Sequence, residues 1–250
     1  MKVVGVIPAR MGSSRFPGKP LAHICGKPMI EHVYRRSAMS KTLDDLYVAT
    51  CDREIFDCVM KFGGKPVMTD VCHERCTDRV AEALQSISCD IVVIIQGDEP
   101  LVTPEMIDEA AAPMISDPSI RCINLIADID TDEDFIDPNE VKVVIDRNGD
   151  ALYFSREPIP SVKKGARDFP RYKQVCIMPF RREFLFTYTT LPPTPLENIE
   201  SVDMLRILEH GYTIRMIHTD KKTCSVDTPE DLHYVESIME KDPLFRNHAY

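Results

Sequence analysis

The sequence predicts an α/β fold: a three-layer, Rossmann-like sandwich with a mostly parallel sheet and one antiparallel hairpin excursion. Short apolar runs alternate with amphipathic helical patterns over the first half of the chain, as in repeated β-α-β units with right-handed crossovers. The run Ile91–Ile95 is apolar on both faces, which is typical of a central parallel strand. Asn148-Gly149 separates two β-rich runs and predicts the hairpin.

Each expected element has a local signal. The expected strands are Val3–Ile7, Leu46–Ala49, Pro66–Met68, Ile91–Ile95, Ile123–Ala127 and Ile214–Ile217, with the hairpin strands Val141–Asp146 and Ala151–Phe154. The expected helices are Pro28–Ser37, Arg53–Phe62, Thr77–Ser86, Pro104–Ile115 and Glu197 to about Glu209. Thr228 and Pro229 suit the N-cap and first position of a last helix.

The composition is that of a globular protein, and we expect residues 1–250 to form a single domain. Hydrophobic residues make up 44% and charged residues 28% of the chain. The net charge of -10 repels nucleic acid phosphates, so we expect no nucleic acid partner. No apolar run approaches the roughly 20 residues that cross a bilayer, so we expect no membrane contact and a cytoplasmic protein.

The nine cysteines are odd in number and include no C-x-x-C pair, which favours free thiols over a disulfide framework. Cys72, His73 and Cys76 supply three soft donors within five residues. Their spacing matches none of the usual zinc patterns, so a metal site there is the disfavoured alternative.

The loop that follows the first expected strand contains three cations, Arg10, Arg15 and Lys19, among small residues. In open α/β sheets, ligands bind beyond the carboxyl ends of the strands, where this loop lies. The loop is not a Walker loop, because Gly12 to Gly18-Lys19 is one residue too long, and it lacks G-x-G-x-x-G. Clustered cations suit a nucleoside triphosphate that loses pyrophosphate. The alternative is a solvated basic loop.

Two aspartates occupy similar positions at the ends of expected strands. Asp98 follows the buried run Ile91–Ile95 after the turn residue Gly97, where a carboxylate facing phosphates commonly holds magnesium. Asp227 precedes the last helix and, taken alone, is explained by helix capping. Paired with Asp98, it becomes a candidate second magnesium ligand.

Five motifs occur in order between residues 8 and 232: PAR-x-G-S-S-R-x-P-G-K-P-L, Q-G-D-E-P, V-K-V-V-x-D-x-x-G-x-A-L-Y-F-S-R-x-x-I-P, P-L-E-x-I-E and V-D-T-P-E-D-L. On these motifs the chain resembles the CMP-Kdo synthetases (3-deoxy-manno-octulosonate cytidylyltransferases) over nearly its whole length. The resemblance implies a nucleotidyltransferase sandwich that works as a homodimer with Mg²⁺. It implies transfer of CMP from CTP to an acidic sugar, a step of lipopolysaccharide biosynthesis, with about residues 140–195 forming the hairpin, acceptor and dimerisation subregion.

The resemblance and the loop chemistry together assign the site residues. The expected catalytic residues are Arg10, Lys19, Asp98 and Asp227, with magnesium on Asp98 and Asp227. The expected nucleotide-binding residues are Pro8, Ala9, Arg10, Gly12, Ser13, Ser14, Arg15, Lys19, Thr77 and Gln96. The expected acceptor-binding residues are Arg79, Gln96, Arg156, Gln174, Met178, Glu197 and Glu200.

The chain departs from the family pattern in two places. Family members commonly read H-x-S-G-T-[DE]-R where this chain has His73 to Arg79 with Arg75-Cys76 in place of Ser-Gly. They also commonly carry a His and a Tyr where this chain has Gln174 and Met178. The first change removes a glycine that permits a positive φ or a close approach to the base. The second removes two groups that would hydrogen-bond a polyhydroxy sugar.

Three functions therefore stay open at this point. The first is CMP transfer to a Kdo-type acid, with the changes as neutral drift. The second is the same transfer to another acid: 8-amino-Kdo, a nonulosonic acid or a phosphonate. The third is a non-catalytic, nucleotide-binding relative, which the retention of both Asp98 and Asp227 disfavours.

Overall fold

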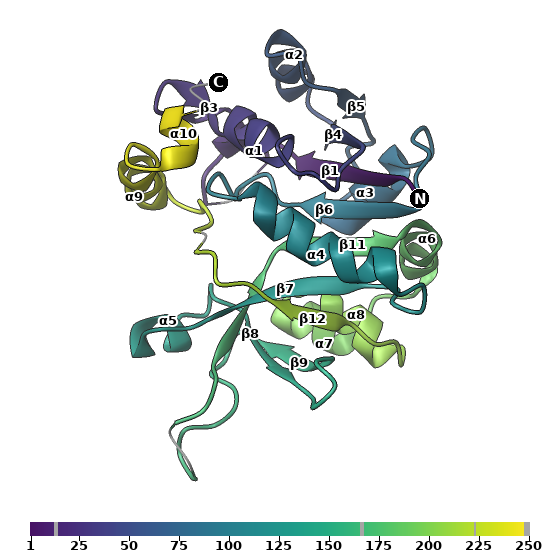
Figure 1. The fold of residues 1–250 in the computed structure, drawn as a ribbon, viewed down its shortest axis with the longest axis vertical. Helices are drawn as coiled ribbons and strands as arrows, with labels where there is room; N and C mark the ends of the chain where they lie inside the picture. The colour runs from purple at the N-terminus through teal and green to yellow at the C-terminus, as the bar shows by residue number, and fades with distance from the viewer. Residues whose placement is uncertain (13–14, 166–167, 223, 248–250) are drawn as a thin grey trace. The chain divides into compact units, whose positions relative to one another are not determined.

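A computed structural model describes residues 1–12, 15–165, 168–222 and 224–247, and its course is drawn in Figure 1. The chain divides into two compact units: unit 1 consists of Met1–Asp108 and Lys222–Tyr250, and unit 2 consists of Glu109–Lys221. That residues 1–250 form a single domain stays a prediction. In the described part of the chain, no helix is long and apolar enough to cross a membrane.

Unit 1 is the parallel α/β half that the sequence predicts. Its strands are β1 (Val3–Ala9), β4 (Asp45–Thr50), β5 (Pro66–Met68) and β6 (Ile91–Ile95), which lie side by side in the order β6-β1-β4-β5. All three pairings within this order are parallel. Every residue of β1 and β6 is buried, which explains why both strands are apolar on both faces.

Short helices connect these strands. They are η1 (Lys19–Leu21), α1 (Met29–Ser37), α2 (Arg53–Lys61) and α3 (Cys76–Ala83), while β2 (His23–Ile24) and β3 (Lys27–Pro28) form a small antiparallel pair. α4 (Pro104–Ser116) begins in unit 1 and ends in unit 2. The expected strands and helices of this half are therefore confirmed, with ends that differ by a few residues.

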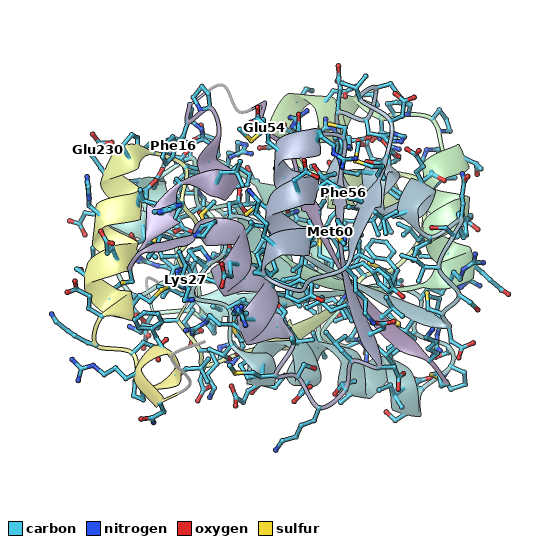
Figure 2. All side chains as sticks on the ribbon, turned by 90° about the horizontal axis from the view of Figure 1, so that it is seen from above. Phe16, Lys27, Glu54, Phe56, Met60 and Glu230 are labelled. Carbon is cyan, nitrogen blue, oxygen red and sulfur yellow. The ribbon has the colours of Figure 1, made fainter. Side chains whose placement is uncertain are left out.

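The C-terminal segment returns to unit 1 and packs against its opening residues. It contains α9 (Pro229–Met239) and α10 (Pro243–Asn247), which lie next to β3 and α1 in Figure 1. A buried cluster joins the two parts of unit 1: Ile24, Met29, Leu101, Val226, Val235 and Met239. Phe16 packs on this cluster and lies beside the first turn of α9, where Figure 2 labels Glu230. The predicted cap of α9 is confirmed, because Asp231 N donates to Thr228 Oγ1 at 3.2 Å.

Unit 2 contains a mixed sheet with the strand order β12-β7-β10-β8-β9. These strands are β7 (Ile123–Asp128), β8 (Lys142–Ile145), β9 (Ala151–Ser155), β10 (Tyr172–Val175) and β12 (Arg215–His218). The β8–β9 hairpin is confirmed, and Gly149 adopts a φ of 82° in its turn. Antiparallel pairing extends further than expected, because β10 pairs antiparallel with both β7 and β8. Unit 2 also contains α5 (Asp132–Ile136), β11 (Ile177–Arg181) and α6 (Arg182–Thr190).

The single helix expected from Glu197 to about Glu209 is wrong. The structure has two helices, α7 (Pro195–Glu200) and α8 (Met204–Glu209), separated at Ser201, whose φ is 53°. A left-handed residue ends an α-helix, because it turns the following N–H groups away from the helical ladder. The break leaves Glu200 at the end of α7, where its carboxylate accepts hydrogen bonds from β9 and the residue that follows it.

Candidate functional site

Lys19 joins the two candidate metal ligands within unit 1. Its Nζ lies 2.6 Å from Asp98 Oδ2 and 3.1 Å from Asp227 Oδ1. It also donates to the carbonyl oxygen of Val226 at 3.0 Å. Lys19 comes from η1, Asp98 from the turn after β6, and Asp227 from the residues before α9. Three distant parts of the chain therefore meet at one ammonium group.

The surroundings keep this ammonium charged. The side chains of Lys19, Asp98 and Asp227 are 13%, 28% and 26% exposed, so they are only partly screened by water. Burial alone lowers the pKa of Lys19, but the charges of Asp98 and Asp227 and the hydrogen bonds to them outweigh burial and raise it above its usual value. Arg15 Nη2 adds a second cation at 3.1 Å from Asp227 Oδ1 and is half exposed.

Local backbone geometry explains how the three side chains meet. Gly18 adopts a φ of 75° and donates to Met11 O at 3.0 Å, which turns the chain into η1 and places Lys19. A Cβ on Gly97 would lie 2.9 Å from the carbonyl oxygen of Pro8, so only glycine lets this turn approach β1 so closely. Val226 N then donates to Asp98 O at 2.9 Å, which fixes the two aspartate segments side by side.

The pair Asp98 and Asp227 fits a hard divalent cation. Both are carboxylates, the ligands that Mg²⁺ prefers, and both already face one shared cation, the Lys19 ammonium. Among the described residues, no three or more His, Cys, Asp and Glu side chains gather to hold a metal. Mg²⁺ commonly takes one or two protein carboxylates and completes its octahedron with phosphate oxygens and water, so two ligands are sufficient.

Other residues predicted to bind the nucleotide lie at the end of β1 and in the loop that follows it. Pro8 and Ala9 are buried in β1, whereas Arg10 and Gly12 are exposed just beyond it. Met11 N donates to Asp52 Oδ2 at 2.7 Å, so an aspartate at the end of β4 shapes the loop. Sequence reasoning missed Asp52, although its position between β4 and the start of α2 was a usable signal. The predicted Ser13 and Ser14 lie outside the described residues.

Arg79 organises the segment before α3. Its side chain is 3% exposed, and Nη1 donates to Thr69 Oγ1 at 2.7 Å and to Asp70 O at 3.1 Å. Nη2 donates to His73 O at 3.0 Å. This arrangement gives Arg79 a role in shaping the loop from Thr69 to His73, in addition to the acceptor contact predicted for it.

Thr77 and Gln96 lie near the same segment. Thr77 is fully buried at the start of α3. Gln96 follows β6 and donates from Nε2 to Cys76 Sγ at 3.2 Å. Cys76 is one of the two residues that replace the family's Ser-Gly, so the substituted thiol contacts a residue predicted to bind both nucleotide and acceptor.

In unit 2, Glu200 and Arg156 form a compact polar cluster. The Glu200 carboxylate accepts from Tyr153 OH at 3.2 Å, Ser155 Oγ at 3.0 Å and Arg156 N at 2.8 Å. Arg156 Nε donates a hydrogen bond to Glu200 O at 2.7 Å.

The same cluster contains Lys142, which sequence reasoning missed. Lys142 is fully buried and donates to Arg156 O at 2.5 Å. Burial lowers the pKa of Lys142, and a lysine inside the V-K-V-V run was its signal.

Three other residues predicted to bind the acceptor are hydrogen-bonded or buried within unit 2. Glu197 is fully buried and pairs with both Arg206 Nε and Nη2, at 2.7 and 2.6 Å. Gln174 Nε2 donates to Asn124 Oδ1 at 2.5 Å, and Met178 is 3% exposed. The acceptor roles of these residues, like those of Arg156 and Glu200, stay predictions.

Comparison with known proteins identifies the family. A sequence model of the cytidylyltransferases matches residues 4–219. A 3-deoxy-manno-octulosonate cytidylyltransferase of Geobacter metallireducens is 46% identical over 98% of this chain and 100% of its own length. One from Syntrophus aciditrophicus is 48% identical over 95% of this chain and 97% of its length. The chain belongs to the cytidylyltransferase family.

Solved cytidylyltransferase structures agree with this assignment. A CMP:2-keto-3-deoxy-manno-octonic acid synthetase, solved in complex with CTP, superposes with a TM-score of 0.91 at 40% identity and covers 96% of this chain. A cytidylyltransferase from Leptospira borgpetersenii, at 18% identity and a TM-score of 0.65, shares the fold. The resemblance inferred from the five motifs is confirmed, and so is the predicted α/β nucleotidyltransferase fold.

Proposed function

We propose that this cytidylyltransferase transfers CMP from CTP to an acidic sugar of the Kdo type and releases pyrophosphate. One observation carries the proposal: Lys19 Nζ lies within 3.1 Å of the carboxylates of both Asp98 and Asp227. These three side chains unite the first loop with the turn after β6 and the segment before α9, and such a loop at the carboxyl end of a parallel strand is where α/β folds bind a triphosphate and its counter-ion. The named relatives support the choice of CTP and Kdo.

The proposed reaction needs no covalent enzyme intermediate. A hydroxyl oxygen of the acceptor attacks the α-phosphorus of CTP and its proton passes to solvent. The bond from that phosphorus to the bridging oxygen breaks, and pyrophosphate leaves with the electron pair. Catalysis then consists of positioning and charge neutralisation. Arg10, Arg15 and Lys19 supply the positive charge that binds the triphosphate, with Lys19 moving from its carboxylate partners toward a phosphate.

We propose Mg²⁺ as the cofactor, held by Asp98 and Asp227. When bound, the ion supplies charge neutralisation at the phosphate oxygens. The two aspartates fix its place relative to the first loop, and their backbone is itself fixed by the hydrogen bond from Val226 N to Asp98 O. With two protein carboxylates as ligands, a bound Mg²⁺ would take its other ligands from phosphate and water, as it commonly does.

Asp98→Asn tests the proposal. Asparagine keeps the size of the side chain and removes its charge, so we expect kcat/KM to fall by about 100-fold or more, in the range seen when a single charge-stabilising group is removed. Asp90→Asn is the matched control, because Asp90 precedes β6 at its amino end, away from the loop. Both variants should keep the wild-type far-UV circular dichroism. Near-normal turnover by Asp98→Asn would contradict the proposed site.

A second candidate is the same transfer to a different acid. It is favoured by Gln174 and Met178, which stand where family members commonly have His and Tyr. Pyrophosphate release should be measured with CTP and a panel of acids: Kdo, 8-amino-Kdo, a nonulosonic acid and a phosphonate. A clear preference for Kdo removes this candidate. Nucleotide binding without turnover on any acid would instead support a non-catalytic relative.

We also propose that the protein works as a homodimer in the cytoplasm, where CTP is available, without nucleic acid or membrane partners. The family resemblance supports the dimer. Sedimentation equilibrium at micromolar concentration should give twice the mass of one chain, and a single-chain mass would contradict the dimer.

A further inference from the structure

Arg36 on α1 is buried, and its guanidinium connects two separate segments of unit 1. The side chain is 2% exposed. Nε donates to Val102 O at 2.6 Å, and Nη2 donates to Leu101 O at 3.2 Å. Nη1 pairs with Asp242 Oδ2 at 2.5 Å. Because the guanidinium is planar and its donors have fixed directions, it sets the positions of these three acceptors relative to one another.

The first segment carries Asp98. Leu101 and Val102 close the turn that begins after β6, and Val102 N donates to Glu99 O at 3.0 Å. Asp98 lies in the turn just before it, which Glu99 N closes by donating to Gln96 O at 3.4 Å, so the two turns share Glu99. The two carbonyl groups held by Arg36 therefore fix the end of the turn, while Gly97 fixes its start against β1.

The second segment carries Asp227. Asp227 N donates to Asp231 Oδ2 at 3.0 Å in the first turn of α9, and Asp242 follows the last turn of the same helix. A capped helix of this length behaves as a rigid rod, so holding Asp242 at one end limits how Asp227 can move at the other. Cys25 N adds a contact to the last turn of α9, where it donates to Glu236 Oε1 at 2.7 Å.

We propose that Arg36 is a positioning residue for the two aspartates. It acts through Leu101, Val102 and Asp242, and it holds the two aspartate segments at the separation at which both carboxylates face one cation. The proposal rests on the proposed function, because it concerns the same pair of carboxylates. On this proposal, the ion pair of Arg36 and Asp242 affects cation affinity. A purely structural ion pair would affect stability alone.

Four variants test the role of Arg36: Arg36→Met, Asp242→Ala, Asp242→Asn and the double variant Arg36→Met/Asp242→Ala. For each, the Mg²⁺ activation constant and kcat are measured at saturating CTP and Kdo, and binding of the Mn²⁺–CTP complex is measured by calorimetry without acceptor. Arg35→Met is the matched control, because Arg35 is the next residue on α1 and pairs with Glu31 at 2.8 Å, away from these segments.

We expect Arg36→Met and Asp242→Ala to raise the Mg²⁺ activation constant by about 10- to 100-fold, the effect typical of residues that orient metal ligands, while kcat at saturating Mg²⁺ changes much less. Asp242→Asn keeps an oxygen for Nη1 and should lie between Asp242→Ala and the wild type. The double variant should be no worse than Arg36→Met, because Asp242 acts through Arg36. Arg35→Met should keep the wild-type constant.

Loss of thermal stability with an unchanged activation constant and unchanged Mn²⁺–CTP affinity would overturn the proposal, because it would leave Arg36 with a packing role alone. Should Arg36→Met fail to fold, the two Asp242 variants decide the question. Should the wild type transfer CMP to none of the acids, the proposed function fails, but the Mn²⁺–CTP titration still measures whether Arg36 sets cation affinity.

Discussion

Replacing Lys19 with methionine should destabilise the protein and at the same time strengthen its response to Mg²⁺. Methionine keeps most of the length of lysine and removes the charge. Asp98 and Asp227 then face each other without the ammonium that lies 2.6 and 3.1 Å from them. In the variant, a divalent cation no longer competes with a resident positive charge for the two carboxylates.

The size of both effects follows from the exposure of the three side chains. Exposed ion pairs contribute about 0–1 kcal/mol, whereas breaking a buried pair costs about 3–5 kcal/mol. At 13%, 28% and 26% exposure, the triad lies between these limits, so we expect a loss of about 1–3 kcal/mol without metal. A tenfold gain in Mg²⁺ affinity then adds about 1.4 kcal/mol to the metal-dependent stabilisation.

Urea unfolding at pH 7.5 measures both effects, once with EDTA and once with excess Mg²⁺. The chain has no tryptophan, so far-UV circular dichroism is the suitable probe. At this pH the Lys19 ammonium is charged, because its pKa lies above the usual 10.5. Lys65→Met is the control, because the Lys65 side chain is 57% exposed and its Nζ pairs with Asp45 Oδ1 at 2.6 Å. It should lose at most about 1 kcal/mol and keep the wild-type response to Mg²⁺.

Equal stabilisation of the wild type and Lys19→Met by Mg²⁺ would refute the reasoning, because it would mean that the ammonium and the metal do not share the carboxylates. A variant as stable as the wild type in EDTA would refute the ion triad itself. If Lys19 binds phosphate, Lys19→Met should lose activity whether or not the ammonium competes with Mg²⁺. Only the stability measurement therefore separates phosphate binding by Lys19 from its competition with the metal.

Three further changes have clear expected outcomes. Burial lowers the pKa of His32 below its usual 6.5, so near this pH the unfolded chain binds a proton that the native state does not. The free energy of unfolding should therefore fall as pH decreases below 6.5. His32→Gln should reduce the difference in unfolding free energy between pH 7.5 and pH 5, measured by urea unfolding. Gly97→Ala places a Cβ 2.9 Å from Pro8 O and should cost about 1–3 kcal/mol in unfolding free energy, with a matching loss of turnover. Arg206→Met removes the ion pair of the fully buried Glu197 carboxylate and should cost about 3–5 kcal/mol, measured in the same way; a loss below 1 kcal/mol would contradict the stabilising role of this pair.

The parallel half of the fold could be predicted because its strands are apolar on both faces. Ile91–Ile95 is a buried strand with the bounds expected from the sequence. The antiparallel half was harder, because β10 reads Tyr-Lys-Gln-Val, with three of its four side chains only partly buried. β11 contains Pro179, a residue that normally argues against a strand. In both strands, pairing with neighbours overrides a weak local signal.

The two helices α7 and α8 were predicted as one because helical periodicity continues across the break. Ser201 is not a residue that marks a left-handed conformation in a sequence. The reason for the break lies in tertiary contacts: Glu200 accepts hydrogen bonds from Ser155 and Arg156 N, and Arg156 Nε binds the Glu200 carbonyl group. A continued helix would direct that carbonyl group into the helical ladder instead.

For the candidate site, the sequence indicated the participants but not their arrangement. Asp98 and Asp227 were paired on the basis of family motifs and strand-end positions, whereas nothing in the sequence placed Lys19 between them. Strand ends can be predicted from local patterns, but the path of the C-terminal segment back to unit 1 depends on packing among residues far apart in the chain.

Arg36 illustrates this limit most clearly. In the sequence it is one of two adjacent arginines near the end of an amphipathic helix, a position that favours solvated cations through the helix dipole. Arg35 fits that expectation, with a side chain 32% exposed, whereas Arg36 is 2% exposed. The difference arises because Leu101, Val102 and Asp242 together enclose one guanidinium. A buried arginine costs free energy unless its donors are satisfied, so its presence between the two aspartate segments is a reason to test it for more than stability.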